Sequence, residues 1–336
     1  MPGGSVRCGR AFAPAHVSGI FVPRLDSRDP RGRGSLGAGL VLDAGVWAYA
    51  EWQATARSAL RVTADVRSPL EISEAVARRL LARRRGRLTL RLEHALPIGQ
   101  GFGSSAAGAL ATGLAVAAAL QLPRGRAVEV AHLADLFGGG GLGGVAAILG
   151  GGLEVRLRAG IPPFGRIVRE PVDRTVLVGT VGAPIRSPGL LHHPARMRRF
   201  ADATGLFEEF AARPSWEAFW TVSERFTDSV RLTTPRLTTI LRGLRRRGAR
   251  AAQAMFGRSF FAAPPPGEGE VRVRRWLTEG EVPFREIAVA RRGARRTAVS
   301  GDGPTRPGPG GDEVATGPAS RDERGSLGVA ADARVF

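Results

Sequence analysis

The segment PIGQGFGSSAA at 97–107 combines glycines and serines in an order that could bind a polyanion. Gly99, Gly101 and Gly103 come directly before Ser104 and Ser105. Glycines let a backbone approach a polyanion closely, and the free N–H groups and dipole of a helix N-terminus favour negative charge. Serine hydroxyls can also reach a phosphate or a Mg²⁺ ion attached to it. These residues predict a binding site for the phosphate chain of a nucleotide.

The spacing of these glycines does not by itself identify a known nucleotide motif. It matches neither G-x-x-x-x-G-K-[ST] nor G-x-G-x-x-G, and the chain contains no lysine. An alternative therefore stays open at this point, in which the glycines only allow a buried helix to pack tightly on a sheet.

The elements on either side of this segment can be predicted from hydrophobic periodicity. The alternating run LTLRLEHA predicts a strand at 88–93, and the helix expected at about 104–121 is apolar on nearly every face and must be buried. A helix is expected at about 68–85, with Ser68 as N-cap, Pro69 at its first position and a buried stripe of Ile72, Val76 and Leu80. A further helix, AVEVAHLADLF, runs into the glycine-rich stretch 138–152.

The remaining segments are predicted from the same signals. The first 60 residues or so suggest hairpin strands, and LEVRLRA and TVLVGTVGAP suggest two more. The stretch from about 192 to 250 is mostly helical in pattern, followed by the compact segment AAQAMFGRSFFAA and a strand pair near 270–290. Residues 297–336 are rich in proline, glycine and charge and are expected to be disordered.

Composition limits the classes of protein that fit. With 336 residues and 43% apolar content the chain can form two modest domains or one large two-lobed domain, and the single cysteine, Cys8, excludes a disulfide framework. The N-terminus lacks the apolar core of a signal peptide and the longest apolar run, LAVAAAL, is too short to span a bilayer, so we expect a cytoplasmic protein with no membrane partner.

The formal net charge of the chain is +19, and all of its basic residues are arginine. These arginines do not alternate with aromatic residues, as a platform for nucleic-acid bases requires. Nucleic-acid binding is therefore disfavoured as the main function.

The segment at 97–107 resembles the second motif of the GHMP kinase superfamily, P-x-x-x-G-L-G-S-S-A-A, with Phe102 in place of the leucine. Within the superfamily, FAPAHVSGIFVP, GRGSLGAGLVLDAGV, AHLADLF and AMFGRSFFA are similar to the archaeal pantoate kinases, over about residues 10–295. The resemblance implies a two-lobed α+β fold. Residues 1–165 would form an N-terminal lobe with ribosomal-protein-S5-like topology and residues 166–296 a ferredoxin-like C-terminal lobe, with 297–336 as a disordered tail.

The resemblance also implies ATP and Mg²⁺ as cofactors. Ser104 and Asp135 would act in catalysis, and Ser105 and Asp135 would bind Mg²⁺. Met255, Phe256 and Gly257 would form the third motif, which supports the glycine-serine segment 97–105, here called the phosphate loop. The residues expected to bind ATP are Pro97, Gly99, Gly101, Phe102, Gly103, Ser104, Ser105, Ala106 and Gly257.

The acceptor implied by the resemblance is pantoate, phosphorylated to 4-phosphopantoate in coenzyme A biosynthesis. His16, Ser35, Gly37, His132 and Arg156 would line its pocket, with Arg156 supplying positive charge for a carboxylate. The habit of the family suggests a homodimer.

Two positions depart from the family pattern. The glutamate of A-H-x-A-E is Asp135 here, and the aspartate of G-L-G-D is Gly144, so the group that would orient or deprotonate the acceptor hydroxyl is missing. A general base contributes roughly 10²–10⁴-fold, and phosphoryl transfer depends mainly on positioning and charge stabilisation, so activity without it is expected. Homoserine kinases similarly look as though they work without this carboxylate. If Gly144 marks a lost base, Gly144→Asp should raise turnover.

Three alternatives stay open from the sequence. One is a GHMP kinase acting on another small hydroxy acid, and another is a catalytically silent nucleotide-binding protein of the same fold. The third is an arginine-rich nucleic-acid binder.

Overall fold

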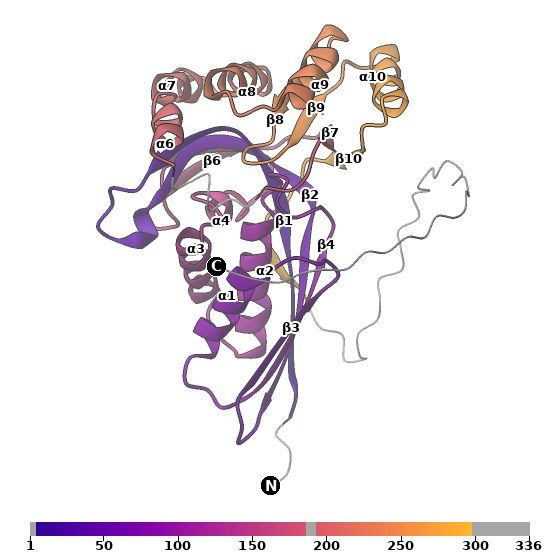
Figure 1. Ribbon diagram of the computed structural model, residues 1–336. Coiled ribbons are helices and arrows are strands. Elements are labelled where there is room, and N and C mark those ends of the chain that lie inside the picture. The colour runs from indigo at the N-terminus through magenta and orange to yellow at the C-terminus, as the bar shows by residue number, and fades with distance from the viewer. Residues whose placement is uncertain (1–4, 186–192, 298–336) are drawn as a thin grey trace, which may run out of the picture. The chain divides into compact units, whose positions relative to one another are not determined.

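A long antiparallel hairpin at the N-terminus is the base of the fold in the computed structural model, which describes residues 5–185 and 193–297 (Figure 1). Strands β1 (Arg7–Arg24) and β2 (Gly34–Ala54) pair along almost their whole lengths and are joined by the 3₁₀ turn η1 (Pro30–Gly32). The predicted hairpin is confirmed. The tail expected to be disordered lies outside the described residues from position 298 onward.

A seven-stranded sheet is built on this hairpin. Its main path runs β11-β1-β2-β4-β3, while β5 pairs with β2 and β6 pairs with β5. Only the β3–β4 pair is parallel among the described pairings of this sheet. The added strands are β3 (Ala59–Ala64), β4 (Gly86–His94), β5 (Leu153–Arg158), β6 (Arg166–Glu170) and β11 (Arg295–Thr297).

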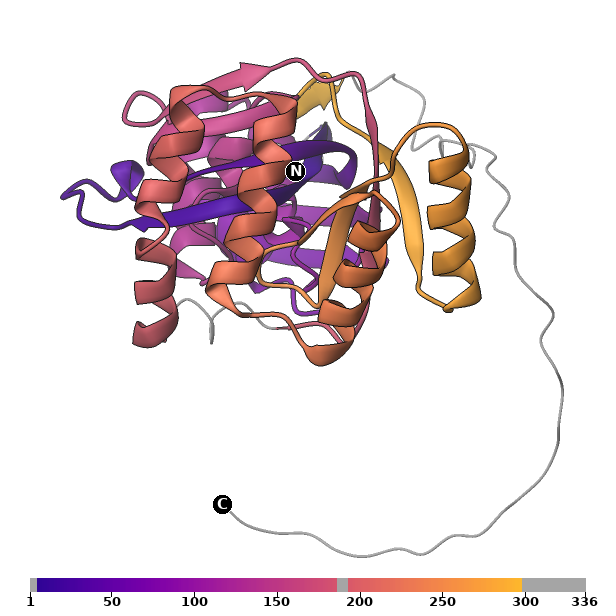
Figure 2. The ribbon, with the colours of Figure 1, turned by 90° about the horizontal axis from the view of Figure 1, so that it is seen from above.

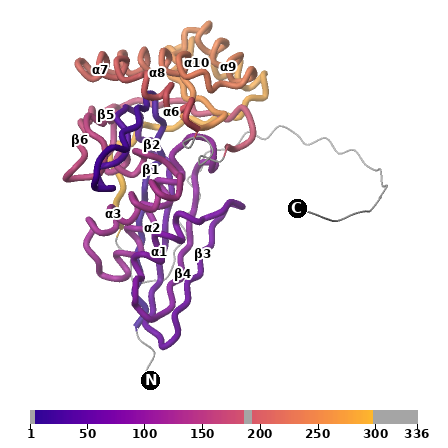
Figure 3. The backbone as a smooth tube through the Cα atoms, turned by 60° about the vertical axis from the view of Figure 1, so that its left-hand side comes forward, coloured from indigo at the N-terminus to yellow at the C-terminus, as the bar shows by residue number. Residues whose placement is uncertain are grey.

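Helices cover one face of this sheet, as Figures 1 and 3 show. They are α1 (Glu71–Leu81), α2 (Ser104–Ala119), α3 (Arg124–Phe137) and the single turn α4 (Gly144–Ala147). Helix α2 contacts β1, β2, α1 and α3, and 14 of its 16 residues are buried. Because this helix is surrounded by protein, its first turn is held rigidly against the sheet.

A second, four-stranded antiparallel sheet has the order β10-β7-β9-β8. Its strands are β7 (Thr175–Thr180), β8 (Arg250–Gln253), β9 (Ser259–Ala263) and β10 (Phe284–Ala288). Its helices are α6 (Pro194–Ala201), α7 (Thr204–Ala212), α8 (Trp216–Val230), α9 (Pro235–Arg246) and α10 (Glu268–Glu279). Helices α6, α7 and α8 also contact β1, and Figure 2 shows them above the indigo hairpin.

Two local predictions are wrong. The strand pair expected near 270–290 is present only in β10, because 268–279 is helix α10, in which Val273 and Leu277 are buried four residues apart and Glu270 pairs with Arg274. Helix α1 begins at Glu71 instead of near Ser68, and Leu70 takes the N-cap position. The predicted buried stripe of α1 is confirmed in Val76 and Leu80.

The boundary between lobes at residue 165 stays a prediction. Strands β6 and β11 lie on the far side of that boundary in sequence, yet they pair with β5 and β1 in the first sheet. No helix in the described ranges 5–185 and 193–297 is long and apolar enough to cross a membrane.

Candidate active site

The glycine-serine segment forms a left-handed turn between β4 and α2. Gly99, Gly101 and Gly103 have φ values of 76°, 77° and 68°, a region that favours glycine because it lacks a β-carbon. Gly103 takes the N-cap position of α2, and since it has no side chain, the N–H groups of the first helical turn stay available to an anion. The predicted strand, turn and buried helix are therefore confirmed.

The turn is anchored to β1 on one side. The His16 N–H donates to the Phe102 carbonyl at 3.0 Å, and the Phe102 side chain is buried. A β-carbon at Gly103 would lie 3.2 Å from atoms of His16. This close packing fixes the turn against the hairpin.

The turn is supported on its other side by the segment 254–257 that joins β8 and β9. A β-carbon at Gly101 would lie 2.5 Å from the Met255 carbonyl oxygen, and one at Gly257 would lie 2.0 Å from the Gln100 carbonyl oxygen. Ser259 Oγ donates to that same Gln100 oxygen. The family resemblance implies that Met255, Phe256 and Gly257 support the phosphate loop, and of these Met255 and Gly257 lie directly against it.

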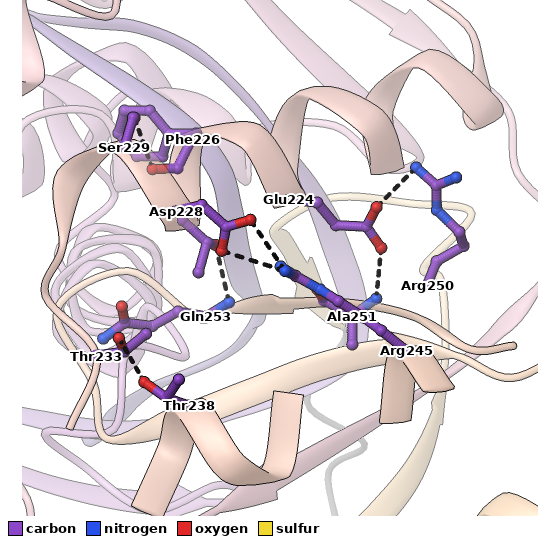
Figure 4. A network of polar contacts seen from close by, with 11 residues as sticks. Glu224, Phe226, Asp228, Ser229, Thr233, Thr238, Arg245, Arg250, Ala251 and Gln253 are labelled. Carbon is purple, nitrogen blue, oxygen red and sulfur yellow. Dashed lines mark hydrogen bonds and ion pairs between the residues drawn. The ribbon is translucent and has the colours of Figure 1, made fainter. Parts of the chain in front are cut away.

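A network of polar contacts holds β8, and with it the supporting segment, in place (Figure 4). The backbone N–H of Gln253 donates to Thr227 Oγ1 at 3.1 Å, and that of Ala251 donates to Glu224 Oε1 at 3.0 Å. The Gln253 side chain donates to the Gly257 carbonyl at 2.9 Å. Helix α8 therefore binds the strand that leads into the supporting segment.

The two serines at the start of α2 make different contacts. Ser104 Oγ donates to the Pro97 carbonyl at 3.4 Å, closing the turn on itself. Ser105 Oγ donates to Asp135 Oδ1 at 2.6 Å, so the first turn of α2 is joined to α3.

Asp135 is a buried carboxyl group with 2% of its surface exposed. Burial raises its pKa to about 7, although the hydrogen bond from Ser105 opposes the shift. A β-carbon at Gly140 would lie 2.1 Å from Asp135 Oδ1 and 2.2 Å from Ser105 Oγ. Any side chain at position 140 would therefore collide with Asp135 and Ser105, so this position after α3 requires glycine.

These oxygens suit a magnesium ion that is also bound by phosphates. Mg²⁺ in nucleotide sites takes one or two protein carboxylates and fills its octahedron with phosphate oxygens and water. Within the described residues, no group of three or more His, Cys, Asp or Glu could hold a metal ion by itself. Ser105 and Asp135 therefore fit Mg²⁺ as part of a metal–nucleotide complex, not as a separate metal centre.

The predicted acceptor residues His16, Gly37 and Arg156 come together where β1, β2 and β5 meet. In the pairing of β2 with β5, Gly37 is opposite Arg156 and Gly39 is opposite Glu154. His16 Nε2 lies 2.9 Å from Glu154 Oε1, which also accepts a hydrogen bond from Arg156 Nη1. All three polar side chains are buried.

Burial and pairing set the charges of this cluster. Burial lowers the pKa of His16, despite its contact with the Glu154 carboxylate. Burial alone would raise the pKa of Glu154, but the Arg156 guanidinium and the hydrogen bond from His16 outweigh it and hold that pKa below its usual range. The cluster therefore contains an ionised glutamate beside an arginine.

Ser35 lies beside the same cluster, while the contacts of His132 lie elsewhere. A β-carbon at Gly143 would lie 2.5 Å from Ser35 Oγ and 3.0 Å from Arg156 Nε. His132 Nε2 lies 3.4 Å from the Pro30 carbonyl oxygen, so this ring contacts η1. Burial lowers its pKa.

Gly144 lies at the start of α4, between the two halves of the site. A β-carbon there would be 2.6 Å from Ala106 Cβ and 4.0 Å from Asp135 Oδ2. The expectation that Gly144→Asp raises turnover needs revision, because Ala106 on rigid α2 occupies the space that the new side chain needs.

Glu154 belongs to the cluster of His16 and Arg156 but is not among the residues predicted for the site. In LEVRLR it alternates with apolar residues, a pattern that usually indicates a solvated strand face. The sequence feature that could have indicated this cluster is the pair of glycines in β2. Gly37 and Gly39 leave room for the side chains of Arg156 and His16.

Comparison with known proteins gives consistent matches. Residues 71–152 match the family model described as the GHMP kinases N terminal domain. A pantoate kinase of Thermococcus kodakarensis is 30% identical over 285 residues, covering 82% of this chain and 93% of that protein. A pantoate kinase of Methanospirillum hungatei is 30% identical over 259 residues, covering 75% and 86%. A solved structure titled "Phosphotransferase related to CoA biosynthesis pathway" has 28% identity and a TM-score of 0.77, covering 86% of this chain and 98% of that one.

Proposed function

The chain belongs to the GHMP kinase family, and on that premise we propose that it phosphorylates pantoate with ATP, giving 4-phosphopantoate for coenzyme A biosynthesis. GHMP kinases are ATP-dependent enzymes, and two relatives that are 30% identical to this chain over most of its length are pantoate kinases. The observation that carries the proposal is the left-handed turn of Gly99, Gly101 and Gly103 at the N-terminus of the buried helix α2.

The turn and the first residues of α2 would bind the phosphates of ATP. The N–H groups of Ser104, Ser105 and Ala106 lie in the first turn, where the helix dipole favours negative charge. Ser105 and Asp135 would hold Mg²⁺, which supplies positive charge to the transferring phosphoryl group when bound. This chain's residues thus position the donor without forming a covalent bond to it.

The acceptor would bind beside Arg156, Ser35 and Gly37. Pantoate carries a carboxylate, and a buried guanidinium with a neighbouring hydroxyl is a suitable partner for one. His16 joins this pocket to the phosphate loop, since its backbone N–H bonds to Phe102 and its ring contacts Glu154. The acceptor and ATP would therefore bind on either side of His16 and Gly103.

The reaction would proceed with no carboxylate at position 144. Substituting Gly144→Asp is expected to lower the free energy of unfolding by about 1–3 kcal/mol, because its β-carbon would overpack against Ala106, and to leave kcat no higher. In an Ala106→Gly background, where that methyl group is removed, the same substitution should raise kcat relative to Ala106→Gly alone. Denaturant unfolding and steady-state kinetics on the three variants would test this. A rise in kcat for Gly144→Asp alone would show that α4 moves freely.

The proposed function is tested by ADP release from the purified protein with Mg²⁺ and ATP, with and without pantoate. Pantoate-dependent ADP together with a product of the mass of phosphopantoate is the expected result. Turnover only with other hydroxy acids would assign a different acceptor. ATP binding without turnover on any acceptor would identify a silent member of the family.

A further inference from the structure

One carboxylate oxygen of Glu154 binds two other buried side chains. Oε1 contacts His16 Nε2 at 2.9 Å and accepts from Arg156 Nη1, while the residue has 0% of its surface exposed. Because a charged pair loses hydration when it is buried, such an arrangement adds little stability compared with apolar packing. Its presence beside the phosphate loop therefore needs another explanation.

The backbone around Glu154 is shaped to admit this cluster. A β-carbon at Gly39 would lie 2.3 Å from His16 Nε2, and one at Gly37 would lie 2.5 Å from Arg156 Nη2. Gly37 also has a φ of 150°, at the edge of the region that favours glycine. Two glycines of β2 thus leave space for the two side chains that Glu154 holds.

Two donors of the cluster are left unused. Within 5–185 and 193–297, buried Ser35 Oγ and Arg156 Nε have no hydrogen-bond partner. Both lie against Gly143, at 2.5 Å and 3.0 Å from the position of a β-carbon there. Buried polar groups are nearly always hydrogen-bonded, so these two donors, together with the buried acceptor Glu154 Oε2 that also has no partner within the same ranges, indicate a ligand that has acceptor oxygens and can donate a hydrogen bond.

We propose that Glu154 is a positioning residue for the acceptor. By holding Arg156 Nη1, it fixes the guanidinium so that Nε faces the same space as Ser35 Oγ, where the acceptor carboxylate is bound. By contacting the His16 ring, it also links the position of the acceptor carboxylate to β1, where the His16 N–H donates to Phe102 of the phosphate loop. This inference rests on the proposed function and adds to it the residue that orients the arginine.

The test is steady-state kinetics of Glu154→Gln with pantoate and with ATP varied separately. The kcat/KM for pantoate is expected to fall about 10- to 100-fold, mainly through KM, because the charged hydrogen bond to Arg156 is lost. The KM for ATP should stay within about twofold. A merely structural role would reduce the active fraction, and so kcat, without a selective change in the KM for pantoate.

Glu93→Gln is a matched control. Glu93 on β4 accepts from Arg91, two residues earlier, as Glu154 does from Arg156 two residues later, but its side chain is 34% exposed. It contacts Tyr49 instead of a residue of the site. Its kinetic constants should match those of the unsubstituted protein.

A double-mutant cycle keeps the inference testable if Glu154→Gln folds poorly alone. Arg156→Gln combined with Glu154→Gln removes both charges, so that neither is left buried without a partner. If Glu154 acts through Arg156, adding Glu154→Gln to Arg156→Gln should change kcat/KM for pantoate by less than about twofold. Additive effects, or equal losses for ATP and pantoate, would overturn the inference. Absence of pantoate turnover in the unsubstituted protein would instead refute the proposed function on which it rests.

Discussion

Asp135→Asn is expected to lower kcat by about 10³-fold and, at pH 8, to stabilise the protein free of nucleotide and metal. Asparagine keeps the shape and can still accept the hydrogen bond from Ser105, but it lacks the charge that would hold Mg²⁺. A metal ion contributes several kcal/mol to stabilising charge in a phosphoryl transfer, which corresponds to a loss of about this size.

The gain in stability follows from the pKa of Asp135. Burial raises that pKa from 3.8 to about 7, so the folded protein holds a proton that the unfolded chain loses as pH rises above 4. As far as Asp135 is concerned, the protein is therefore most stable at low pH, where this carboxyl group is protonated in both the folded and the unfolded state. The free energy of unfolding falls as pH rises from about 4 to about 7, and by pH 8 the total decrease is roughly 4 kcal/mol. Asparagine is neutral throughout, so the variant should show the higher melting temperature at pH 8 and little difference near pH 4.

The measurements are kcat with saturating Mg²⁺ and ATP, and thermal unfolding at both pH values. Asp173→Asn is a suitable control, since Asp173 pairs with Arg291 on the surface and should change neither quantity. A loss of activity together with a lower melting temperature would indicate damage to the fold. Activity within tenfold of the unsubstituted protein would remove Asp135 from the metal site.

The phosphate loop could be predicted because its local sequence determines its conformation. Only glycine readily adopts the φ values found at Gly99, Gly101 and Gly103, and an apolar helix such as α2 has no stable place except inside the protein. Ser105 is part of the same turn, whereas Asp135 is expected only from the family resemblance, and the hydrogen bond between them depends on how α2 packs against α3.

The acceptor cluster could be predicted only in part, because strand register creates it. Glu154 and Arg156 are buried because β5 pairs with a stretch of β2 that carries Gly37 and Gly39. A sequence alone does not tell which strand faces β5, so the alternation in LEVRLR does not distinguish a buried Glu154 from an exposed one. Helix α10 was missed for a similar reason, since its alternation of Val and Arg fits a strand until its packing is known.

Gly101→Ala is expected to weaken Mg²⁺–ATP binding by at least about 100-fold. The φ of 77° costs alanine roughly 1–2 kcal/mol, and its β-carbon would lie 2.5 Å from the Met255 carbonyl oxygen and 2.7 Å from that of Ala254. Those oxygens belong to a backbone segment held by β8 and β9, so the loop must move instead. Moving it would displace the N–H groups of α2 from the phosphates.

Gly125→Ala provides the contrast that assigns this effect to the loop. Gly125 lies in α3, and within 5–185 and 193–297 no atom comes within 4 Å of a β-carbon built there. Alanine should therefore leave ATP affinity unchanged and add up to about 1 kcal/mol of stability through helix propensity.

Calorimetric titration with Mg²⁺–ATP measures the affinity of both variants. Normal affinity in a folded Gly101→Ala protein would mean that the nucleotide phosphates do not bind at this turn. Lost affinity in Gly101→Ala with normal affinity in Gly125→Ala would tie binding to the backbone contact between 101 and 254–255, because the two substitutions add the same methyl group.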